Sequence, residues 1–185
     1  MGHPADQIAS FSDVLHFWRE AGPDKWFEKD DAFDAAICEK FLGTYEAAAA
    51  GKLEAWEATA EGALALVIVL DQFPRNMFRG DARTYAADPL ARAAANLALK
   101  RGYDLDVPEQ ERGFLFLPFM HSEDIDDQKR CVALYREAGD ENLSHAERHA
   151  EIIRRFGRFP HRNAVLGRAT TPEEQAYLDG GGFKG

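Results

Sequence analysis

The longest apolar run of the chain, Ala63 to Leu70, is the feature that most constrains its fold. The run lies in a segment from Gly62 to Phe73 that is apolar on every side, and Thr59 with Glu61 provides a helix start in front of it. A buried strand would explain the β-branched residues equally well, but a lone strand has no pairing partner in this sequence. We therefore expect a helix at the centre of the fold.

Helix signals repeat along the rest of the chain, whereas alternating strand patterns bounded by hairpin turns are hard to find. Capping residues or first-turn prolines precede most of the periodic apolar segments. The predicted helices start at Ser10, Asp31, Gly62, Leu90, Pro108, Ser122, Ser144 and Thr171. This pattern predicts an all-α fold of about eight helices.

Particular residues are expected to begin these helices. Ser144 with Glu147, and Thr171 with Glu174, have the spacing of a capping box, in which each side chain binds the other residue's backbone N–H. Asp88 followed by a proline predicts a cap and a first turn ahead of Leu90.

Prolines are expected to interrupt three helices. Pro118 predicts that the helix starting at Pro108 bends or ends just before His121. Phe73-Pro74 and Phe159-Pro160 each follow an apolar helix, and each is followed by an arginine and an asparagine. We interpret both dipeptides as helix ends, although two copies are weak evidence for a repeat.

The composition is that of an ordinary soluble globular protein. Apolar residues make up 45% of the 185 residues and charged residues 29%. This length allows one domain, residues 1–185, to bury a single core without disulfides or metal ions. Cys38 and Cys131 lack a partner motif and are expected to be buried, reduced thiols. The glycine-rich residues 180–185 are expected to form a frayed, flexible tail.

Composition also excludes several classes of partner. No apolar run approaches the roughly 20 residues that span a bilayer, and the amino terminus has no basic-then-apolar leader. A formal net charge of -10 repels phosphate backbones at long range. We expect a cytoplasmic protein with neither a membrane nor a nucleic acid as its partner, and the sequence leaves the oligomeric state open.

The sequence lacks the common cofactor and metal motifs. It has no glycine-rich phosphate loop, no nucleophile elbow and no paired metal-binding cysteines, so no cofactor is predicted. His145 and His149 stand four apart on one helical face with Ile152 and Phe156, a spacing that can hold a metal ion. The glutamate of zinc proteases is missing, because Ala146 follows His145, and no third ligand is evident. Packing histidines are the preferred interpretation, and no metal site is predicted.

Arginines concentrate near the carboxyl end against the acidic balance of the chain. Five fall within fifteen residues with no acid among them: Arg154, Arg155, Arg158, Arg162 and Arg168. The sequence from Gly157 to Asn163 adds imidazole and amide groups around Pro160. Such a mixture favours a polar surface that binds anions.

Three long motifs resemble a known family. They are Leu70 to Gly80 (LDQFPRNMFRG), Leu117 to Gln128 (LPFMHSEDIDDQ) and Arg148 to Gly167 (RHAEIIRRFGRFPHRNAVLG). The chain resembles the domain of unknown function 924 family from about Val14 to Leu178. This resemblance implies an all-helical fold similar to tetratricopeptide-repeat superhelices. The family carries no settled activity, so the resemblance implies an architecture and no chemistry.

The three motifs follow apolar helices, and their polar side chains are predicted to converge on one cleft. The predicted ligand-binding residues are Asp71, Gln72, Arg75, Arg79, Arg158, Arg162 and Asn163. The predicted acid–base residues are His121, Glu123 and His161. In this hypothesis the arginines oppose Asp71, Glu123 and Asp124, with the two histidines between them.

Each of these residues also has a plainer interpretation. Ser122, Glu123 and Asp124 are what any helix start prefers, because a hydroxyl caps free amides and acids complement the helix dipole. Arg158 and Arg162 would then form ion pairs with Asp71 or Glu123 that hold loops against the core. His161 would donate a hydrogen bond to a carbonyl, as many loop histidines do.

Three functions therefore remain open. A closed pocket in which Arg158, His161 and Glu123 meet would bind a small anionic carboxylate or phosphate compound, and an enzyme of this kind would use Glu123 or His121 as its acid or base. Exposed, dispersed arginines would instead suit a scaffold that grips an acidic peptide. The third interpretation is a purely structural polar network.

Overall fold

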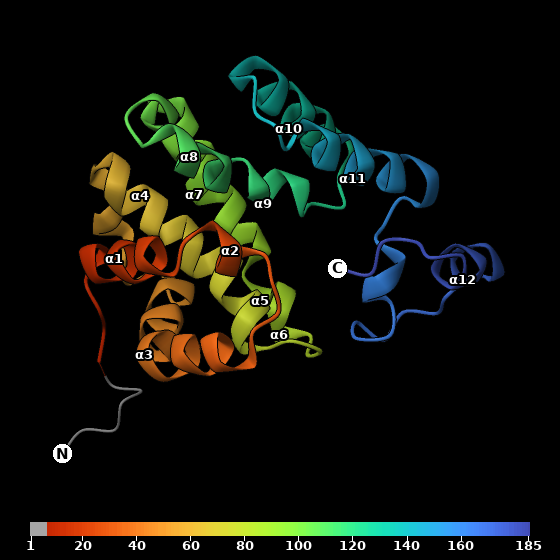
Figure 1. Cartoon of the computed structure of the whole chain (residues 1–185), viewed down its shortest axis with the longest axis horizontal. Coiled ribbons are helices and arrows are strands. Elements are labelled where there is room, and N and C mark those ends of the chain that lie inside the picture. The colour runs from red at the N-terminus through yellow and green to blue at the C-terminus, as the bar shows by residue number, and fades with distance from the viewer. Residues whose placement is uncertain (1–6) are drawn as a thin grey trace. The chain divides into compact units, whose positions relative to one another are not determined.

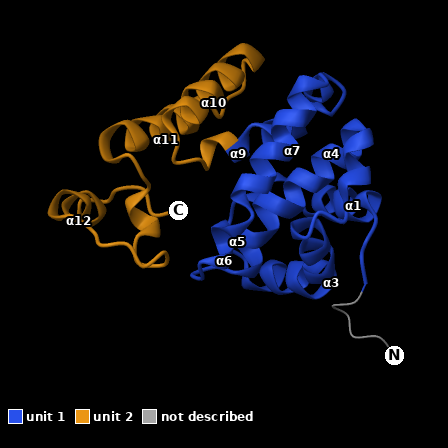
Figure 2. Cartoon of the chain, turned by 180° about the vertical axis from the view of Figure 1, so that it is seen from behind, with its two compact units in different colours: residues 1–118 blue, residues 119–185 orange. Residues whose placement is uncertain are grey.

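The computed structural model describes residues 7–185, and this part of the chain contains helices and no strand (Figure 1). The predicted all-α class is confirmed. The described residues divide into two compact units, an amino-terminal unit that ends at Pro118 and a carboxyl-terminal unit from Phe119 to Gly185 (Figure 2). The single domain and the superhelix stay predictions.

Within residues 7–118 the amino-terminal unit holds eight α-helices and four 3₁₀ or π segments. Its α-helices are α1 (Phe11–Ala21), α2 (Pro23–Trp26), α3 (Asp31–Ala49), α4 (Ala60–Val67), α5 (Phe73–Met77), α6 (Arg83–Ala86), α7 (Asp88–Lys100) and α8 (Glu109–Arg112). The 3₁₀ segments are η2 (Glu54–Ala58), η4 (Tyr103–Leu105) and η5 (Gly113–Leu115), and the π-helix is η3 (Ile68–Gln72). The boundary between the two units falls within α9 (Leu117–Met120).

Helix α4 lies at the centre of the amino-terminal unit, as the apolar run predicts. Every residue from Gly62 to Val67 is buried, and α4 packs against α1, α7 and η2. Gly62 is needed there, because a Cβ atom at this position would lie 2.1 Å from the backbone oxygen of Trp56. Next to α4, the buried Trp18 ring contacts the rings of Phe73 and Phe114.

Helix α4 does not end where the sequence suggests. It continues into the π-helix η3, where the backbone N–H of Phe73 donates to the carbonyl of Ile68, and then into α5. The expected helix end at Phe73-Pro74 is therefore wrong. Pro74 occupies the first turn of α5, where its missing N–H costs little. The wider π turn lets the helix pass the proline.

The second long apolar segment is broken as well. One helix from Pro108 with a bend at Pro118 is expected, whereas the structure has α8, the 3₁₀ segment η5 and α9 in succession. Pro118 lacks the N–H that a continuous helix would use. The expected end just before His121 is confirmed, because α9 ends at Met120.

The carboxyl-terminal unit is built on three helices and one 3₁₀ turn. They are α10 (Ile125–Ala138), α11 (Leu143–Phe156), η6 (Pro160–Arg162) and α12 (Pro172–Asp179). Helices α10 and α11 lie side by side and contact each other along their lengths (Figures 1 and 2). A small core of Ile152, Ile153 and Phe159 joins α11 to the loop that follows it.

The caps account for most of the helix starts. Ser10 with Asp13 and Thr171 with Glu174 form reciprocal capping boxes, and Thr59 accepts from the N–H of Gly62. The box predicted at Ser144 is wrong, because α11 begins one residue earlier.

Competing hydrogen bonds explain the caps that were not predicted correctly. Asp140 accepts from both the backbone and the side chain of Asn142, which starts α11 at Leu143, and Glu147 pairs with Arg136. The cap of α10 is Asp124 in place of the predicted Ser122. Asp88 is the first residue of α7, whose N-cap is Ala87, and its carboxylate accepts hydrogen bonds from Arg75.

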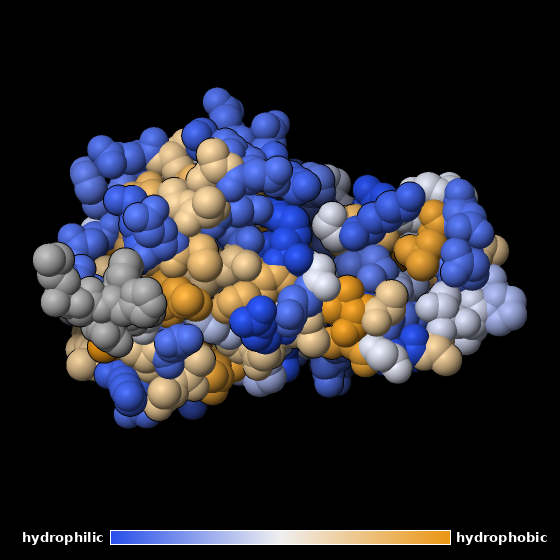
Figure 3. Space-filling view, turned by 90° about the horizontal axis from the view of Figure 1, so that it is seen from below, coloured by the Kyte–Doolittle hydropathy of each residue, from blue (hydrophilic) through white to orange (hydrophobic). Residues whose placement is uncertain are grey.

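On the face drawn in Figure 3, hydrophobic residues gather in small groups between hydrophilic ones.

No helix within residues 7–185 is long and apolar enough to cross a bilayer. Both cysteines are free thiols; Cys131 is fully buried and Cys38 is partly exposed.

Candidate functional site

The first polar motif lies in the amino-terminal unit, where the π-helix and α5 position its side chains. Asp71 is fully buried and accepts a hydrogen bond of 2.6 Å from Nε2 of Gln72. Arg75 donates two hydrogen bonds of 3.0 and 3.1 Å to the carboxylate of Asp88 and lies 3.4 Å from Asp71 Oδ1. Burial lowers the pKa of Arg75, but the two carboxylates outweigh that effect and raise it.

The same motif continues with Asn76 and Arg79, which both bind Asp34 of α3. Asn76 donates to Asp34 over 2.7 Å, and Arg79 donates over 3.0 and 3.1 Å. Two carboxylates, one on α3 and one on α7, therefore hold α5 in place. All the polar side chains named in this motif bind groups within the amino-terminal unit.

Glu123 begins the polar site of the carboxyl-terminal unit. Its carboxylate accepts hydrogen bonds of 2.7 and 2.9 Å from Arg168 and one of 2.7 Å from the backbone N–H of Phe159. Burial raises the pKa of Glu123, but the hydrogen bonds from Arg168 and Phe159 have the larger combined effect and lower it. The carboxylate is therefore held in its charged form.

Glu174 at the start of α12 is the second anion of this site. Arg158 donates to it over 2.6 and 2.9 Å, and Asn163 donates over 3.1 Å. The hydrogen bond from Arg158, with one from the backbone of Thr171, lowers the pKa of Glu174 to about 2. Arg168 also donates to Asn163 Oδ1 over 3.0 Å.

These contacts form one continuous polar network. It runs from Glu123 through Arg168 and Asn163 to Glu174 and Arg158. The sequence predicted that Glu123 and Arg158 would lie in one site, and the network links them through three intermediates, Arg168, Asn163 and Glu174. The partner of Arg158 is Glu174, however, and not Glu123 or Asp71.

A second set of contacts orders the loop before α10. Gln128 is fully buried, and its amide nitrogen lies 2.7 Å from the carbonyls of Met120 and Ser122 and 3.3 Å from that of Phe119. Asp124 accepts from the first N–H groups of α10, which is the capping interpretation of this motif. Arg162 is buried and donates to the carbonyl of His121 over 3.0 Å.

Two histidines lie beside this network in an aromatic environment. Nδ1 of His149 lies 2.7 Å from the carbonyl of His145, and burial lowers the pKa of His149 to about 4. Burial and the charge of Arg162 lower the pKa of His161 to about 3. Nδ1 of His161 is buried and has no hydrogen-bond partner among residues 7–185. Both rings are therefore neutral near pH 7.

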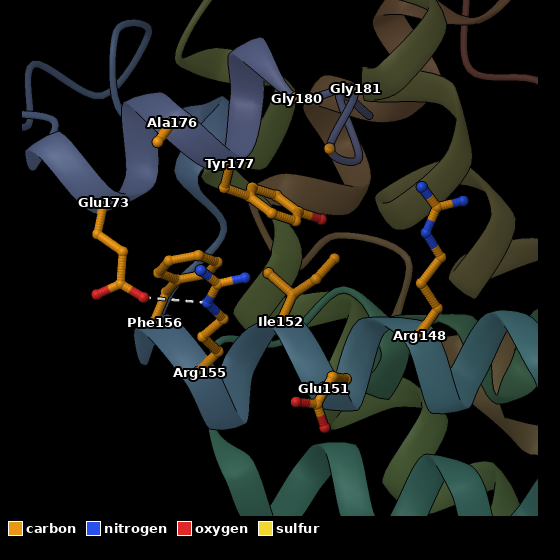
Figure 4. A pocket seen from close by; sticks show the side chains of 11 residues that line it. Arg148, Glu151, Ile152, Arg155, Phe156, Glu173, Ala176, Tyr177, Gly180 and Gly181 are labelled. Carbon is orange, nitrogen blue, oxygen red and sulfur yellow. Dashed lines mark hydrogen bonds and ion pairs between the residues drawn. The ribbon is translucent and has the colours of Figure 1, made fainter.

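A groove of about 590 Å³ lies between α11, α12 and the glycine-rich segment that follows α12 (Figure 4). Arg148 and Arg155 stand near opposite ends of the α11 wall, and the Tyr177 ring lies over Ile152 (Figure 4). Phe156 completes the apolar lining. The volume is within the range of small-molecule sites, roughly 300–1,000 Å³.

Sequence reasoning did not single out the groove residues Arg148 and Tyr177, nor the partner role of Glu174. The sequence does contain a pattern that points to Arg148, because positions 148, 152 and 156 share one helical face and Arg155 lies beside it.

For metal binding, residues 7–185 contain no cluster of three or more histidine, cysteine, aspartate or glutamate side chains that could hold an ion.

Comparison with known proteins supports the fold. A family model described as "Bacterial protein of unknown function (DUF924)" matches residues 14–182. The chain is also similar to a solved structure of a protein of unknown function, ATU0120 from Agrobacterium tumefaciens, with 52% identity and a TM-score of 0.90. That match covers 92% of this chain and 97% of the other. No curated protein matches the chain.

Proposed function

The chain belongs to the DUF924 family of bacterial proteins of unknown function, and we propose that its carboxyl-terminal unit binds a small carboxylate or phosphate compound in the groove between α11 and α12. The single observation that carries this proposal is the environment of Arg148. Its guanidinium group is exposed beside the groove and forms no ion pair or hydrogen bond with any of residues 7–185.

The neighbouring arginines have different environments, which makes Arg148 the favoured anion contact. Arg158 and Arg168 are committed to Glu174 and Glu123. Arg155 pairs with Glu173 over 3.1 Å, but the two side chains are 48% and 66% exposed. Exposed pairs of this kind contribute roughly 0–1 kcal/mol, so an arriving anion can replace Glu173 at little cost.

The rest of the groove suits the carbon skeleton of such a ligand. Ile152 and Phe156 line it from α11, and Tyr177 of α12 supplies an aromatic face. A ligand lying along α11 would contact apolar side chains in the middle of the groove and an arginine toward either end. This arrangement favours a compound with an anionic group and an apolar body.

The residues first predicted to bind the ligand have other partners, and we propose structural roles for them. Arg158, Arg162 and Asn163 each donate to a protein oxygen within the carboxyl-terminal unit. Asp71, Gln72, Arg75 and Arg79 bind groups in the amino-terminal unit. The convergence of all three motifs on one cleft stays a prediction.

Acid–base chemistry has less support than binding. A general acid near neutral pH needs a raised carboxyl pKa, whereas the pKa of Glu123 is lowered and its oxygens accept three hydrogen bonds. We propose that Glu123 anchors the loop after α11. Catalytic roles for His121 and His161 remain hypotheses.

The free thiols of Cys38 and Cys131 fit our proposal of a cytoplasmic location.

Calorimetric titration of the full chain tests the proposal, with inorganic phosphate, acetate, citrate and an acidic peptide as probes. We expect at least one small anion to bind, and Arg148→Ala to weaken that binding at least tenfold. Arg136→Ala is the matched control, because Arg136 is an exposed arginine on the adjacent helix with its own partner, Glu147. Binding that survives Arg148→Ala would refute this site, and binding of the peptide alone would favour a scaffold.

A further inference from the structure

Phe183 inserts its ring between two histidines of the carboxyl-terminal unit, the buried His149 and the partly buried His161. Its ring centroid lies 4.6 Å from that of His149 and 5.2 Å from that of His161, with both pairs in edge-to-face geometry. The guanidinium of Arg148 lies 5.5 Å from the same ring centroid. The aromatic slot, defined by His149, His161 and Phe159, thus holds a ring that arrives from the glycine-rich segment.

One of the rings that define the slot carries a buried polar atom that Phe183 does not satisfy. Nδ1 of His161 is buried without a hydrogen-bond partner among the described residues, and the apolar ring of Phe183 offers none. Buried polar atoms in proteins normally have a partner, and an exception needs an explanation. The structure with Phe183 in the slot therefore leaves one buried polar atom unpaired.

Backbone hydrogen bonds to α12 hold the segment that delivers Phe183, from the N–H of Gly180 to the carbonyl of Ala176 and from the N–H of Gly182 to the carbonyl of Tyr177. Gly180, Gly181 and Gly182 precede it and also line the groove. A Cβ atom at Gly182 would lie 2.5 Å from Tyr177, so the backbone passes the tyrosine closely. The N–H of Phe183 donates to the Tyr177 hydroxyl over 3.0 Å. Three glycines allow this backbone many conformations once those hydrogen bonds open.

We infer that Phe183 occupies a ligand subsite, in which the ring of a small aromatic carboxylate replaces the Phe183 ring while its carboxylate binds Arg148. This inference rests on the proposed function, because it uses the same arginine, and it specifies the ligand class. The slot suits an aromatic ring because two edge-to-face partners already surround it, a geometry that stabilises aromatic pairs beyond simple burial. Arg148 lies close enough to the ring to meet an anionic group attached to it.

The experiment compares phenylacetate, cyclohexylacetate and acetate on the wild-type chain, Phe183→Ala and Phe183→Leu. Phe183→Ala empties the slot, whereas Phe183→Leu keeps most of it filled. We expect Phe183→Ala to bind phenylacetate at least tenfold more tightly than the wild type, because the ligand no longer displaces a ring. Acetate affinity should stay within twofold, and both cyclohexylacetate and Phe183→Leu should show a smaller gain.

Nuclear magnetic resonance provides a readout that does not depend on the variants folding. In the wild-type chain phenylacetate should shift the ring resonances of His149 and His161, and acetate should leave them unchanged. Equal affinity of Phe183→Ala and wild type for phenylacetate, or unmoved histidine resonances at saturation, would overturn the inference.

The two proposals fail in different ways. Binding of acetate or phosphate that depends on Arg148, without any preference for phenylacetate, would support anion binding in the groove and refute the aromatic subsite at Phe183. Tight binding of phenylacetate to Phe183→Ala that is unaffected by Arg148→Ala would support the aromatic subsite and refute Arg148 as the contact of the ligand's carboxylate.

Discussion

Glu123 and Arg168 form an ion pair through two hydrogen bonds, of 2.7 and 2.9 Å, although they stand 45 residues apart in the chain. Glu123 also accepts from the N–H of Phe159, so one carboxylate joins the start of α10 to both ends of the loop after α11. Roughly a quarter of each charged side chain is exposed, which places the pair between a surface ion pair and a buried one.

We predict that Glu123→Gln destabilises the carboxyl-terminal unit by about 1–3 kcal/mol. The substitution keeps the shape and one acceptor for Phe159 but leaves the charge of Arg168 without compensation. Urea unfolding followed by circular dichroism measures the effect. The same change at the exposed Glu137 should be nearly neutral, and equal stability of the two variants would contradict a structural role for Glu123.

Glu174 should make the protein sensitive to acid at low pH. Because Arg158 holds the pKa of Glu174 near 2, below its ordinary value of 4.5, its contribution is fully present above pH 4.5 and is lost as the pH falls toward 2. We expect Glu174→Gln to cost about 1–2 kcal/mol at pH 7 and progressively less at lower pH. A carbon-detected titration of the carboxyl group measures its pKa directly, and a value near 4.5 would contradict the prediction.

His149 and His161 should also make the protein less stable in acid, beginning at a higher pH than the effect of Glu174. The pKa values of His149 and His161 in the folded protein are about 4 and 3, below the ordinary 6.5. Between each folded pKa and pH 6.5, the unfolded chain therefore binds more protons than the folded one. Stability is therefore expected to decrease as the pH falls below 6.5, by about 1 kcal/mol per pH unit for each ring. His161→Asn should make stability depend less on pH in this range. Resonances of His149 and His161 that titrate near pH 6.5 would refute the prediction.

Arg75 and Arg79 lie in one motif, but they should contribute very differently to the free energy of unfolding. Arg75 is mostly buried between two carboxylates, whereas Arg79 is 42% exposed in its pair with Asp34. Arg75→Ala should destabilise by about 3–5 kcal/mol and Arg79→Ala by about 0–1 kcal/mol. All three tryptophans precede residue 57, so tryptophan fluorescence during denaturant unfolding reports on this unit. Similar losses from the two variants would refute the assignment.

Local sequence patterns predicted the helices well. The apolar run in α4 and the capping box at Thr171 depend on residues close in sequence, so periodicity and spacing reveal them. The helix breaks were harder to predict, because a π turn at Ile68 and a competing acceptor at Asp140 depend on details that periodicity does not contain.

The candidate site was predicted only in part, because its contacts link residues far apart in sequence. The arginine cluster indicated where polar chemistry gathers, but it did not indicate which acid each arginine would bind. Glu174 looked like a capping residue, and it is one, yet the same carboxylate also binds Arg158. Phe183 lay in a segment expected to be frayed, and its ring contacts two histidines. Pairings of this kind depend on three-dimensional packing.

The π-helix η3 also gives this protein a place where its length can change by one residue in evolution. A π turn holds one residue more than an α turn, so the loss of one residue between Ile68 and Gln72 would leave a regular α turn with the same overall rotation. Arg75 would then keep its direction toward Asp88. Relatives that keep this ion pair can therefore be one residue shorter in η3, with a regular α-helix in its place.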